Sequence, residues 1–511
     1  MELSMAVSIM LVAIVTLAWK LGNWLWFRPK KLEAFLRQQG ILGNPYRFFY
    51  GDLKENMYLI NQAHSQPFHH FSHDISSRGA PFLRHLIHSY GKNSFMWIGP
   101  IPTVNIMNPE HIKQVFTKIH QFHKVEINPL FKLLVPGLAS YEGDKWAKHR
   151  KIINPAFNQD KLKLMLPQIY ESCNTMIENW NKLMSKKETC EIDVWPCLQS
   201  LSCDMISRSA FGSNYEDGKL IFDLLKELAQ LLMQTIQSVY IPGSRVLPTR
   251  ANKRMKHIDK EIKASLENII KKREEAIKRG EGMKDDLLGL LMESNLKEID
   301  KNMGMSINDV MDECKLFYFA GQETTSVLLV WTMILLSKFP NWQTSAREEV
   351  MQVFGKQIPD LKGLNHLKVV SMILYEVLRL YPAAVVLNRT VDKETSVGNM
   401  VLPRGVQVCL PTMLIHRDKE IWGNDASEFK PERFCGGVSK ATNNNPAAYF
   451  PFGMGPRICI GQNFALIEAK MALALILQNF TFQLSPSYSH APHTLLTLRP
   501  QYGAPLILHQ I

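Results

Sequence analysis

Near its C-terminus the chain reads Phe452-Gly453-Met454-Gly455-Pro456-Arg457-Ile458-Cys459-Ile460-Gly461. Two glycines and a proline ahead of the cysteine predict a tight, rigid loop. Apolar residues from Asn463 onward follow helical spacing, so Cys459 comes just before a helix N-terminus. There, backbone N–H groups and the helix dipole favour a thiolate. Because Gly455 and Gly461 lack a Cβ, the backbone can approach a flat ligand closely.

Arg457 can pair with an acidic group on such a ligand. A thiolate in this setting is the arrangement that binds haem iron. The alternative, from the residues alone, is a structural cysteine buried on a turn. The pattern Phe-x-x-Gly-x-Arg-x-Cys-x-Gly resembles the haem-binding loop of the cytochrome P450 family, matched at Phe452, Gly455, Arg457, Cys459 and Gly461. The resemblance implies that Cys459 is the axial ligand of haem b, and that its loop partners contact the cofactor.

A second motif, Ala320-Gly321-Gln322-Glu323-Thr324-Thr325, interrupts a long apolar helical run. Gly321 costs about 1 kcal/mol of helix stability relative to alanine, and we interpret it as removing bulk where a ligand approaches. Thr324 can hydrogen-bond to a carbonyl one turn earlier, which bends the helix and opens a groove. The motif resembles the oxygen-binding segment of the P450 family. That resemblance implies that Glu323 and Thr324 are catalytic and relay protons. The alternative is a solvated break in a surface helix.

Two further motifs match the family in order along the chain. The spacing of Glu376 and Arg379 places both on one helix face, and Pro431-Glu432-Arg433-Phe434 supplies a second arginine. By themselves such pairs are usually solvated. The resemblance implies that Glu376, Arg379 and Arg433 form a buried structural network that holds the haem loop.

Trp146 and Arg150 also have helical spacing and belong on one face. Alone, they would indicate a solvated basic face with one anchoring tryptophan. The resemblance implies that both lie at a haem propionate, since a planar arginine fork suits a carboxylate. Arg389 resembles a further propionate partner.

The N-terminus predicts a membrane anchor. Residues Leu3–Phe27 are almost entirely apolar and exceed the ~20 residues that a spanning helix needs. Arg28, Lys30 and Lys31 follow the span, so the positive-inside rule places the rest of the chain in the cytosol. A cleaved signal peptide fits less well, because neither a basic n-region nor a small-residue cleavage site is present. We therefore expect a single pass through the endoplasmic reticulum membrane.

The remaining periodicity predicts a mainly α protein with small β-sheets, the cytochrome P450 fold: one large haem domain behind the anchor. We divide the chain into an anchor (residues 1–27), a stiff irregular linker (28–59) and a haem-binding monooxygenase domain (60–511). Predicted helices cover 162–183, 220–239, 258–277, 307–339, 371–380 and 463–477. Predicted strands cover 94–98, 103–107, 395–402 and 406–410. Residues 240–248 indicate either a membrane-dipping loop or a turn.

Composition excludes several other classes of protein. With 46% hydrophobic and 21% charged residues, the chain is not generally disordered. The net charge of +12 comes from interspersed charges without a basic tail, so we predict no nucleic-acid partner. Eight cysteines in 511 residues are too few for a disulfide scaffold, and none forms a CxxC pair. The histidines at 69, 70 and 73, or at 111, 120 and 123, lack the accompanying ligands of a metal site.

Beyond the family, Phe319–Thr325, Tyr240–Gly243 and Leu247–Thr249 resemble a plant branch that includes secologanin synthase and triterpenoid oxidases. The resemblance implies a monooxygenase that inserts one oxygen atom from O2 into a C–H bond of an iridoid, triterpenoid or similar substrate. Electrons would come from NADPH through a cytochrome P450 reductase, which would dock on Lys145, Lys148 and Lys151. Repeated turnover can carry a methyl group on to an aldehyde or acid.

Two other functions stay open on the sequence. A haem-thiolate isomerase or dehydratase would need neither O2 nor a reductase, and the dependence of turnover on NADPH and O2 separates it from a monooxygenase. A non-catalytic haem-binding or lipid-binding membrane protein would bind haem tightly and form no product with any reductase.

Overall fold

The helices predicted from apolar periodicity are present in the computed structural model of the chain. The structure describes residues 2–125, 129–184, 189–213, 215–236, 244, 247–280, 286–301 and 304–511. Residues 237–239 of one predicted helix, and most of the predicted loop at 240–248, lie outside this part of the chain. The helices are α1 (Glu2–Gly22), α2 (Arg28–Gln38), α3 (Leu53–His64), α4 (Ser76–Gly79), α5 (Pro81–Tyr90), α6 (Pro109–Thr117), α7 (Gly143–Ile153), α8 (Gln159–Met184), α9 (Val194–Phe211), α10 (Tyr215–Ile236), α11 (Arg250–Lys278), α12 (Leu287–Lys301), α13 (Ile307–Lys338), α14 (Pro340–Phe354), α15 (Leu361–His366), α16 (Lys368–Leu380), α17 (Thr412–Ile415), α18 (Lys419–Trp422), α19 (Gly437–Ala441) and α20 (Gln462–Asn479).

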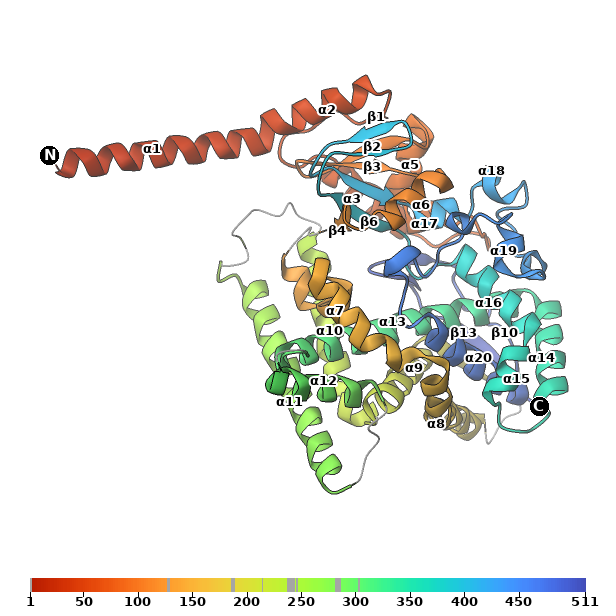
Figure 1. Ribbon diagram of the computed structural model, residues 1–511. Helices are drawn as coiled ribbons and strands as arrows, with labels where there is room; N and C mark the ends of the chain where they lie inside the picture. Colours follow the sequence, from red (N-terminus) through yellow and green to blue (C-terminus); the bar gives the residue numbers. More distant parts are fainter. Residues whose placement is uncertain are drawn as a thin grey trace.

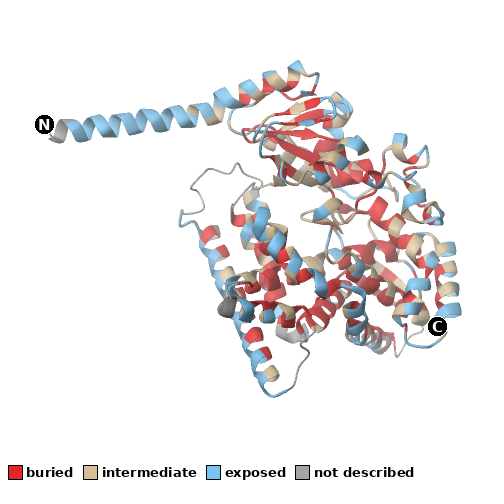
Figure 2. Ribbon diagram, in the orientation of Figure 1, coloured by how far each residue is buried: buried red, intermediate tan, exposed pale blue. Residues whose placement is uncertain are grey.

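Helix α13 forms the centre of the body. Its N-terminus is capped by Ser306, whose hydroxyl accepts the N–H of Asp309. It carries apolar residues around its whole circumference, which is typical of a helix buried on all sides. Helices α9, α16 and α20 pack against it in the main core, and α8 packs in turn on α9 and α20 (Figure 1, Figure 2).

Within the described residues, the strands form four separate sheets. The largest has the order β1-β2-β3-β9-β6-β4; the others are β10-β13-β5, β11-β12 and β7-β8. A second core cluster packs against the large sheet. The strands are β1 (Leu42–Gly43), β2 (Ser94–Ile98), β3 (Ile101–Asn105), β4 (Phe122–Lys124), β5 (Thr189–Asp193), β6 (Leu387–Val391), β7 (Thr395–Val397), β8 (Met400–Leu402), β9 (Gln407–Leu410), β10 (Phe480–Leu484), β11 (Pro492–Thr494), β12 (Leu498–Pro500) and β13 (Pro505–Gln510).

Three of the four predicted strand regions form two hairpins. The regions at 94–98 and 103–107 correspond to β2 and β3, which pair antiparallel, and the region at 395–402 splits into β7 and β8. The strand predicted at 406–410 is instead an inner strand of the large sheet. It pairs parallel with β3 and antiparallel with β6. Strands β4 and β6 were not predicted, because they are short and pair across more than 250 residues of chain.

The N-terminal segment is one long helical rod that extends from the body (Figure 1). Helix α1, a π-helical turn at Asn23–Phe27 and helix α2 follow one another without a break. Residues 5–38 are long and apolar enough to cross a membrane, and their most apolar part is fully exposed. The prediction of an irregular segment over 28–59 is therefore wrong at both ends, where α2 and α3 are helical. Leu36 of α2 is buried against the large sheet.

Candidate active site

The cysteine loop closes on itself before α20 begins. The N–H of Cys459 donates to the carbonyl of Phe452 at 2.9 Å, and that of Ile458 to Gly455 at 3.0 Å. Gly453 and Gly455 have φ of +73° and +72°, which favour glycine. A Cβ on Gly455 would come within 2.8 Å of the Phe116 carbonyl oxygen. The prediction that Gly455 makes room for a flat ligand is therefore wrong, because it lets the loop pack on α6. A Cβ on Gly461 would meet no other atom within 4 Å.

Cys459 is accessible to solvent although protein surrounds its sulfur. Its side chain is exposed to solvent, yet enough protein surrounds the sulfur for desolvation to raise the pKa of the thiol. We infer from these two observations that the sulfur faces a hollow inside the body, which we term the recess. The Gly461 N–H and the charges of Arg150 and Lys124 act in the other direction and lower this pKa. The groups that stabilise a thiolate are thus already assembled around the sulfur.

Four basic side chains, which we term the cation cluster, lie around this recess: Lys124, Arg150, Arg389 and Arg457. Register brings two of them together, because β4 and β6 pair Lys124 with Arg389. Burial, and then the charges of Arg389 and Arg457, lower the pKa of Lys124 to about 7. Burial likewise lowers the pKa of Arg389 to about 10.

Glu142 is the one carboxylate that acts on Lys124, Arg389 and Arg457 in the described part of the chain. It forms an ion pair with Arg457 and accepts the backbone N–H of Lys124 at 2.7 Å. The cation cluster therefore keeps a surplus of positive charge, which suits an anionic ligand.

Helix α7 holds the loop through its two predicted site residues. Arg150 donates from Nη1 to the carbonyl of Ile458 at 2.9 Å, next to the cysteine. Trp146 lies against the guanidinium of Arg457, 4.3 Å from its ring centroid. The structure thus brings Trp146 to Arg457, a cation–π contact that orients the arginine.

Glu323 and Thr324, the acid and the alcohol of the α13 motif, form hydrogen bonds with different partners. Thr324 donates to the carbonyl of Ala320 at 2.8 Å, the backbone contact that the sequence predicts. Glu323 accepts a hydrogen bond from the hydroxyl of Thr497. Helix α13 continues without interruption through the motif.

Gly321 faces another helix instead of a ligand. A Cβ on Gly321 would lie 2.8 Å from the side chain of Ile206 on α9. The sequence-based interpretation of this glycine is therefore wrong. The missing side chain allows α9 and α13 to pack closely.

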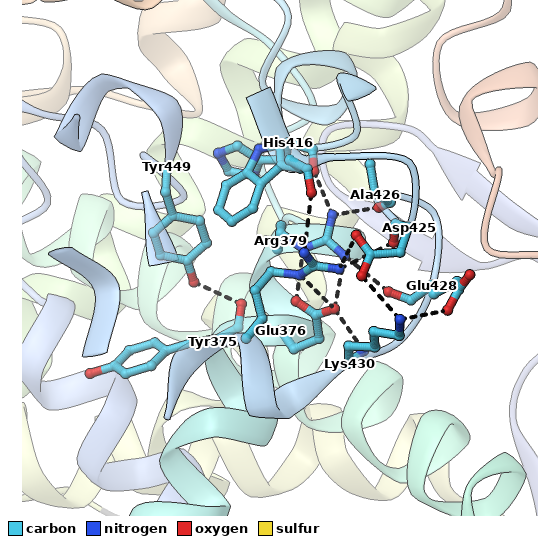
Figure 3. A network of polar contacts seen from close by, with 11 residues as sticks. Tyr375, Glu376, Arg379, His416, Asp425, Ala426, Glu428, Lys430 and Tyr449 are labelled. Carbon is cyan, nitrogen blue, oxygen red and sulfur yellow. Dashed lines mark hydrogen bonds and ion pairs between the residues drawn. The ribbon is translucent and has the colours of Figure 1, made fainter. Parts of the chain in front are cut away.

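Glu376 and Arg379 lie side by side (Figure 3), and Arg433 lies near the same carboxylate. We term these three residues the carboxylate–arginine network. Glu376 and Arg379 are both fully buried and form two hydrogen bonds, at 2.7 and 2.8 Å. Arg433 is more loosely placed, with Nε 3.9 Å from the Glu376 carboxylate. It also donates to the carbonyls of Trp422 and Asp425.

This network connects to the cysteine loop. Arg379 donates to the carbonyl of His416, whose ring Nε2 accepts the N–H of Phe450 at 3.1 Å. Burial lowers the pKa of His416 to about 3, so the ring is neutral and can accept. Tyr449 donates its hydroxyl to the carbonyl of Tyr375 at 2.8 Å. The residues that lead into the loop are thus fixed to α16.

Comparison with known proteins identifies the class to which this site belongs. The family model for Cytochrome P450 matches residues 68–504. The fold is similar to that of retinoic acid-bound cyanobacterial CYP120A1, with a TM-score of 0.75, 24% sequence identity, and coverage of 92% of this chain and 98% of that one. The chain therefore belongs to the cytochrome P450 family, the haem-thiolate monooxygenases.

Relatives at higher identity define the branch. Cytochrome P450 72A397 of Kalopanax septemlobus is 58% identical, covering 97% of this chain and 95% of that protein. Cytochrome P450 CYP72A219 of Panax ginseng is 56% identical, over 98% and 97%. The 7-deoxyloganic acid hydroxylase of Catharanthus roseus is 52% identical, over the full length of both. Within the family, this chain is a member of the plant CYP72A subfamily, the branch that the sequence motifs predict.

The residues around the recess fit a haem. The Cys459 thiol, with its stabilising donors, would ligate the haem iron, and the surplus charge of the cation cluster would bind the propionates. Among the described residues, no group of three or more His, Cys, Asp or Glu side chains is placed to hold a metal ion. When bound, haem supplies the oxygen-activating chemistry.

Sequence reasoning missed Lys124 and Glu142. A single lysine or glutamate has no motif around it, and both lie beside the cysteine loop only because β4 meets the N-terminus of α7 there. The signal that could have found Lys124 is its pairing with Arg389, which requires the strand register.

Proposed function

We propose that this P450 inserts one oxygen atom from O2 into a C–H bond of a terpenoid-derived substrate, an iridoid or a triterpenoid. The observation that carries the chemistry is a thiol on a recess wall surrounded by four cations and one carboxylate. The substrate class is supported by the 52% identity to 7-deoxyloganic acid hydroxylase over the whole chain.

In this proposal, Cys459 binds the haem iron, and the cation cluster binds the propionates. Trp146 acts on a propionate through Arg457, while Phe452 and Gly461 shape the loop next to the cofactor. Glu323 and Thr324 would relay protons in the active site. Glu376, Arg379 and Arg433 have a structural role. Repeated oxidation of one carbon would carry a methyl group on to an aldehyde or acid.

Electrons come from NADPH through a cytochrome P450 reductase. The basic face of α7 supports its docking, although Lys145 is engaged with Asp309 at 2.7 Å. Lys151 is exposed and is the sharper test. Lys151→Glu should slow haem reduction and flatten its salt dependence, because a rim charge acts mainly on association. An unchanged rate and salt dependence would remove the docking site.

The exposed apolar rod supports a single-pass anchor in the endoplasmic reticulum membrane with the catalytic domain in the cytosol. We keep the division into an anchor (1–27), a connecting segment (28–59) and a haem domain (60–511), with helical ends to the connecting segment. Protease treatment of sealed microsomes tests the orientation: the body should be digested without detergent.

Co-expression with a reductase tests the function. Microsomes would receive 7-deoxyloganic acid and a panel of triterpenes with NADPH, and mass spectrometry would follow the gain of one oxygen atom. The wild type should also give the carbon-monoxide difference band of a thiolate-bound ferrous haem, and Cys459→Ser should lose it. A normal band without product from any panel member contradicts the substrate class. Absence of the band contradicts the haem-thiolate assignment itself.

A further inference from the structure

The acid and alcohol of α13 point to different partners. Thr324 donates to the helix backbone at Ala320, whereas Glu323 accepts from Thr497 in the turn between β11 and β12. Within the described residues, no hydrogen bond joins the Glu323 and Thr324 side chains. An acid that gives up a proton in each catalytic cycle must be protonated again. The groups around its carboxylate therefore matter as much as its distance to the alcohol.

The turn that carries Thr497 is firmly held against α13. The carbonyl of Leu498 accepts the indole N–H of Trp331 at 2.8 Å, and the N–H of Leu498 donates to Ala383 at 3.2 Å. Thr497 itself is 8% exposed. Its hydroxyl therefore has a fixed position, and the Glu323 carboxylate is the side-chain acceptor it meets there.

A small cavity begins at the same carboxylate. Its volume is about 30 Å³, which is enough for water, since one molecule needs roughly 10–15 Å³ measured in this way. Its polar walls include three glutamines and two cations. Two of these lining residues, Lys226 and Gln230, are exposed to solvent. The lining residues are Gln199, Lys226, Ala229, Gln230, Phe319, Gln322, Glu323, Leu495, Leu496 and Arg499.

We propose that Thr497 is a positioning residue that holds the Glu323 carboxylate at this cavity, where the acid takes up its proton from water before turning toward Thr324. The inference rests on the proposed proton relay. It adds the residue that positions Glu323 and the cavity from which Glu323 is protonated again. The step is a proton transfer alone: a cavity water gives a proton to the carboxylate, and the proton is replaced from solvent beside the exposed Lys226 and Gln230.

The test uses the full chain with a reductase in microsomes and NADPH, without added substrate, so that no knowledge of the substrate is needed. The readouts are the ratio of hydrogen peroxide to water formed per NADPH, and the slowing of NADPH consumption in D2O. Thr497→Val should raise the peroxide-to-water ratio by about fivefold, as expected for loss of one hydrogen bond, and should enlarge the D2O effect. Thr497→Ser keeps the hydroxyl and should match the wild type.

A control is available in the same hairpin. Thr494 has a buried hydroxyl with no hydrogen-bond partner in the described part of the chain, so Thr494→Val should change neither readout. In a Glu323→Gln background, Thr497→Val should add nothing, because a positioning residue acts only through its acid. Gln199→Leu removes a polar wall from α9 without touching the hairpin and should shift both readouts in the same direction as Thr497→Val.

Wild-type values in both Thr497→Val and Gln199→Leu would overturn the inference. Additive effects of Glu323→Gln and Thr497→Val would also overturn it, by showing that Thr497 acts elsewhere. If Glu323→Gln leaves the peroxide-to-water ratio unchanged, the relay in the proposed function fails instead. The carbon-monoxide band of each variant reports folding and haem binding independently.

Discussion

The carboxylate–arginine network and the cation cluster both bury arginines, but only the network balances them. Arg379 uses all five N–H donors: two bind the Glu376 carboxylate and three bind the carbonyls of His416, Ala426 and Glu428. In the cation cluster, Glu142 is the single carboxylate for several cations in the described chain, and burial lowers the pKa of Lys124 and Arg389.

This difference distinguishes a structural site from a binding site. A buried charge whose donors are all satisfied inside the protein holds chain segments together. A buried cation without enough carboxylates is costly until a ligand supplies the missing charge. The two clusters should therefore respond to mutation with opposite signs.

The largest effect is expected in the balanced network. Arg379→Leu leaves Glu376 buried without its ion-pair partner, which should lower the free energy of unfolding by about 3–5 kcal/mol. Urea unfolding of the full chain in detergent, followed by tryptophan fluorescence, measures it. A loss below about 1 kcal/mol would mean that the network is not a structural site.

In the cation cluster, removing a charge should instead stabilise the haem-free chain. Lys124→Met keeps the side-chain volume and removes a charge that is repelled by Arg389 and Arg457. The free energy of unfolding of the haem-free chain should rise by on the order of 1 kcal/mol, while haem should transfer to apomyoglobin several-fold faster. A destabilised haem-free chain, or unchanged haem transfer, would contradict a ligand-binding role for Lys124.

The pH dependence of the free energy of unfolding tests the lowered pKa of Lys124 in the cation cluster. The unfolded chain keeps the Lys124 proton up to the ordinary pKa of 10.5, whereas the folded chain releases it at about 7. Between these values the unfolded state binds more protons, so this residue makes the haem-free chain more stable as pH rises. Unfolding midpoints measured from pH 7 to 10 should show a steeper rise for the wild type than for Lys124→Met. Equal slopes would contradict the lowered pKa.

The smallest effect is expected at the edge of the network. Lys430 pairs with Asp425 and Glu428 at 3.0 and 3.1 Å, but its side chain is 39% exposed (Figure 3). Since exposed ion pairs contribute little, Lys430→Ala should leave the unfolding midpoint within error. It is the matched control for Arg379→Leu, and a large loss here would mean that burial does not separate the two positions.

Local patterns predicted the parts that depend on neighbours in the chain. The anchor follows from a run of apolar residues, the cysteine loop from Gly453 to Cys459, and α13 from its periodicity. Glu376 and Arg379 share a helix face because they are three residues apart. Each of these features rests on contacts or spacing within one or two turns.

The features that sequence reasoning missed depend on packing between distant segments. Gly321 is small because Ile206 of α9 lies against it, and Gly455 because the Phe116 carbonyl does. The direction of Glu323 is set by Thr497, 174 residues away in the chain. Side-chain spacing carries no information about which distant element a residue will meet.

Residue order thus specified the thiol, the neighbouring Glu323 and Thr324, the paired Glu376 and Arg379, and the apolar rod, because loop, helix and membrane preferences act over short stretches. The folded arrangement alone brought Lys124 and Glu142 beside Cys459 and turned Glu323 toward a water-sized cavity. The physical reason is that charge balance and solvent access are properties of the space around a side chain, and that space is assembled from strands and helices that are remote in sequence.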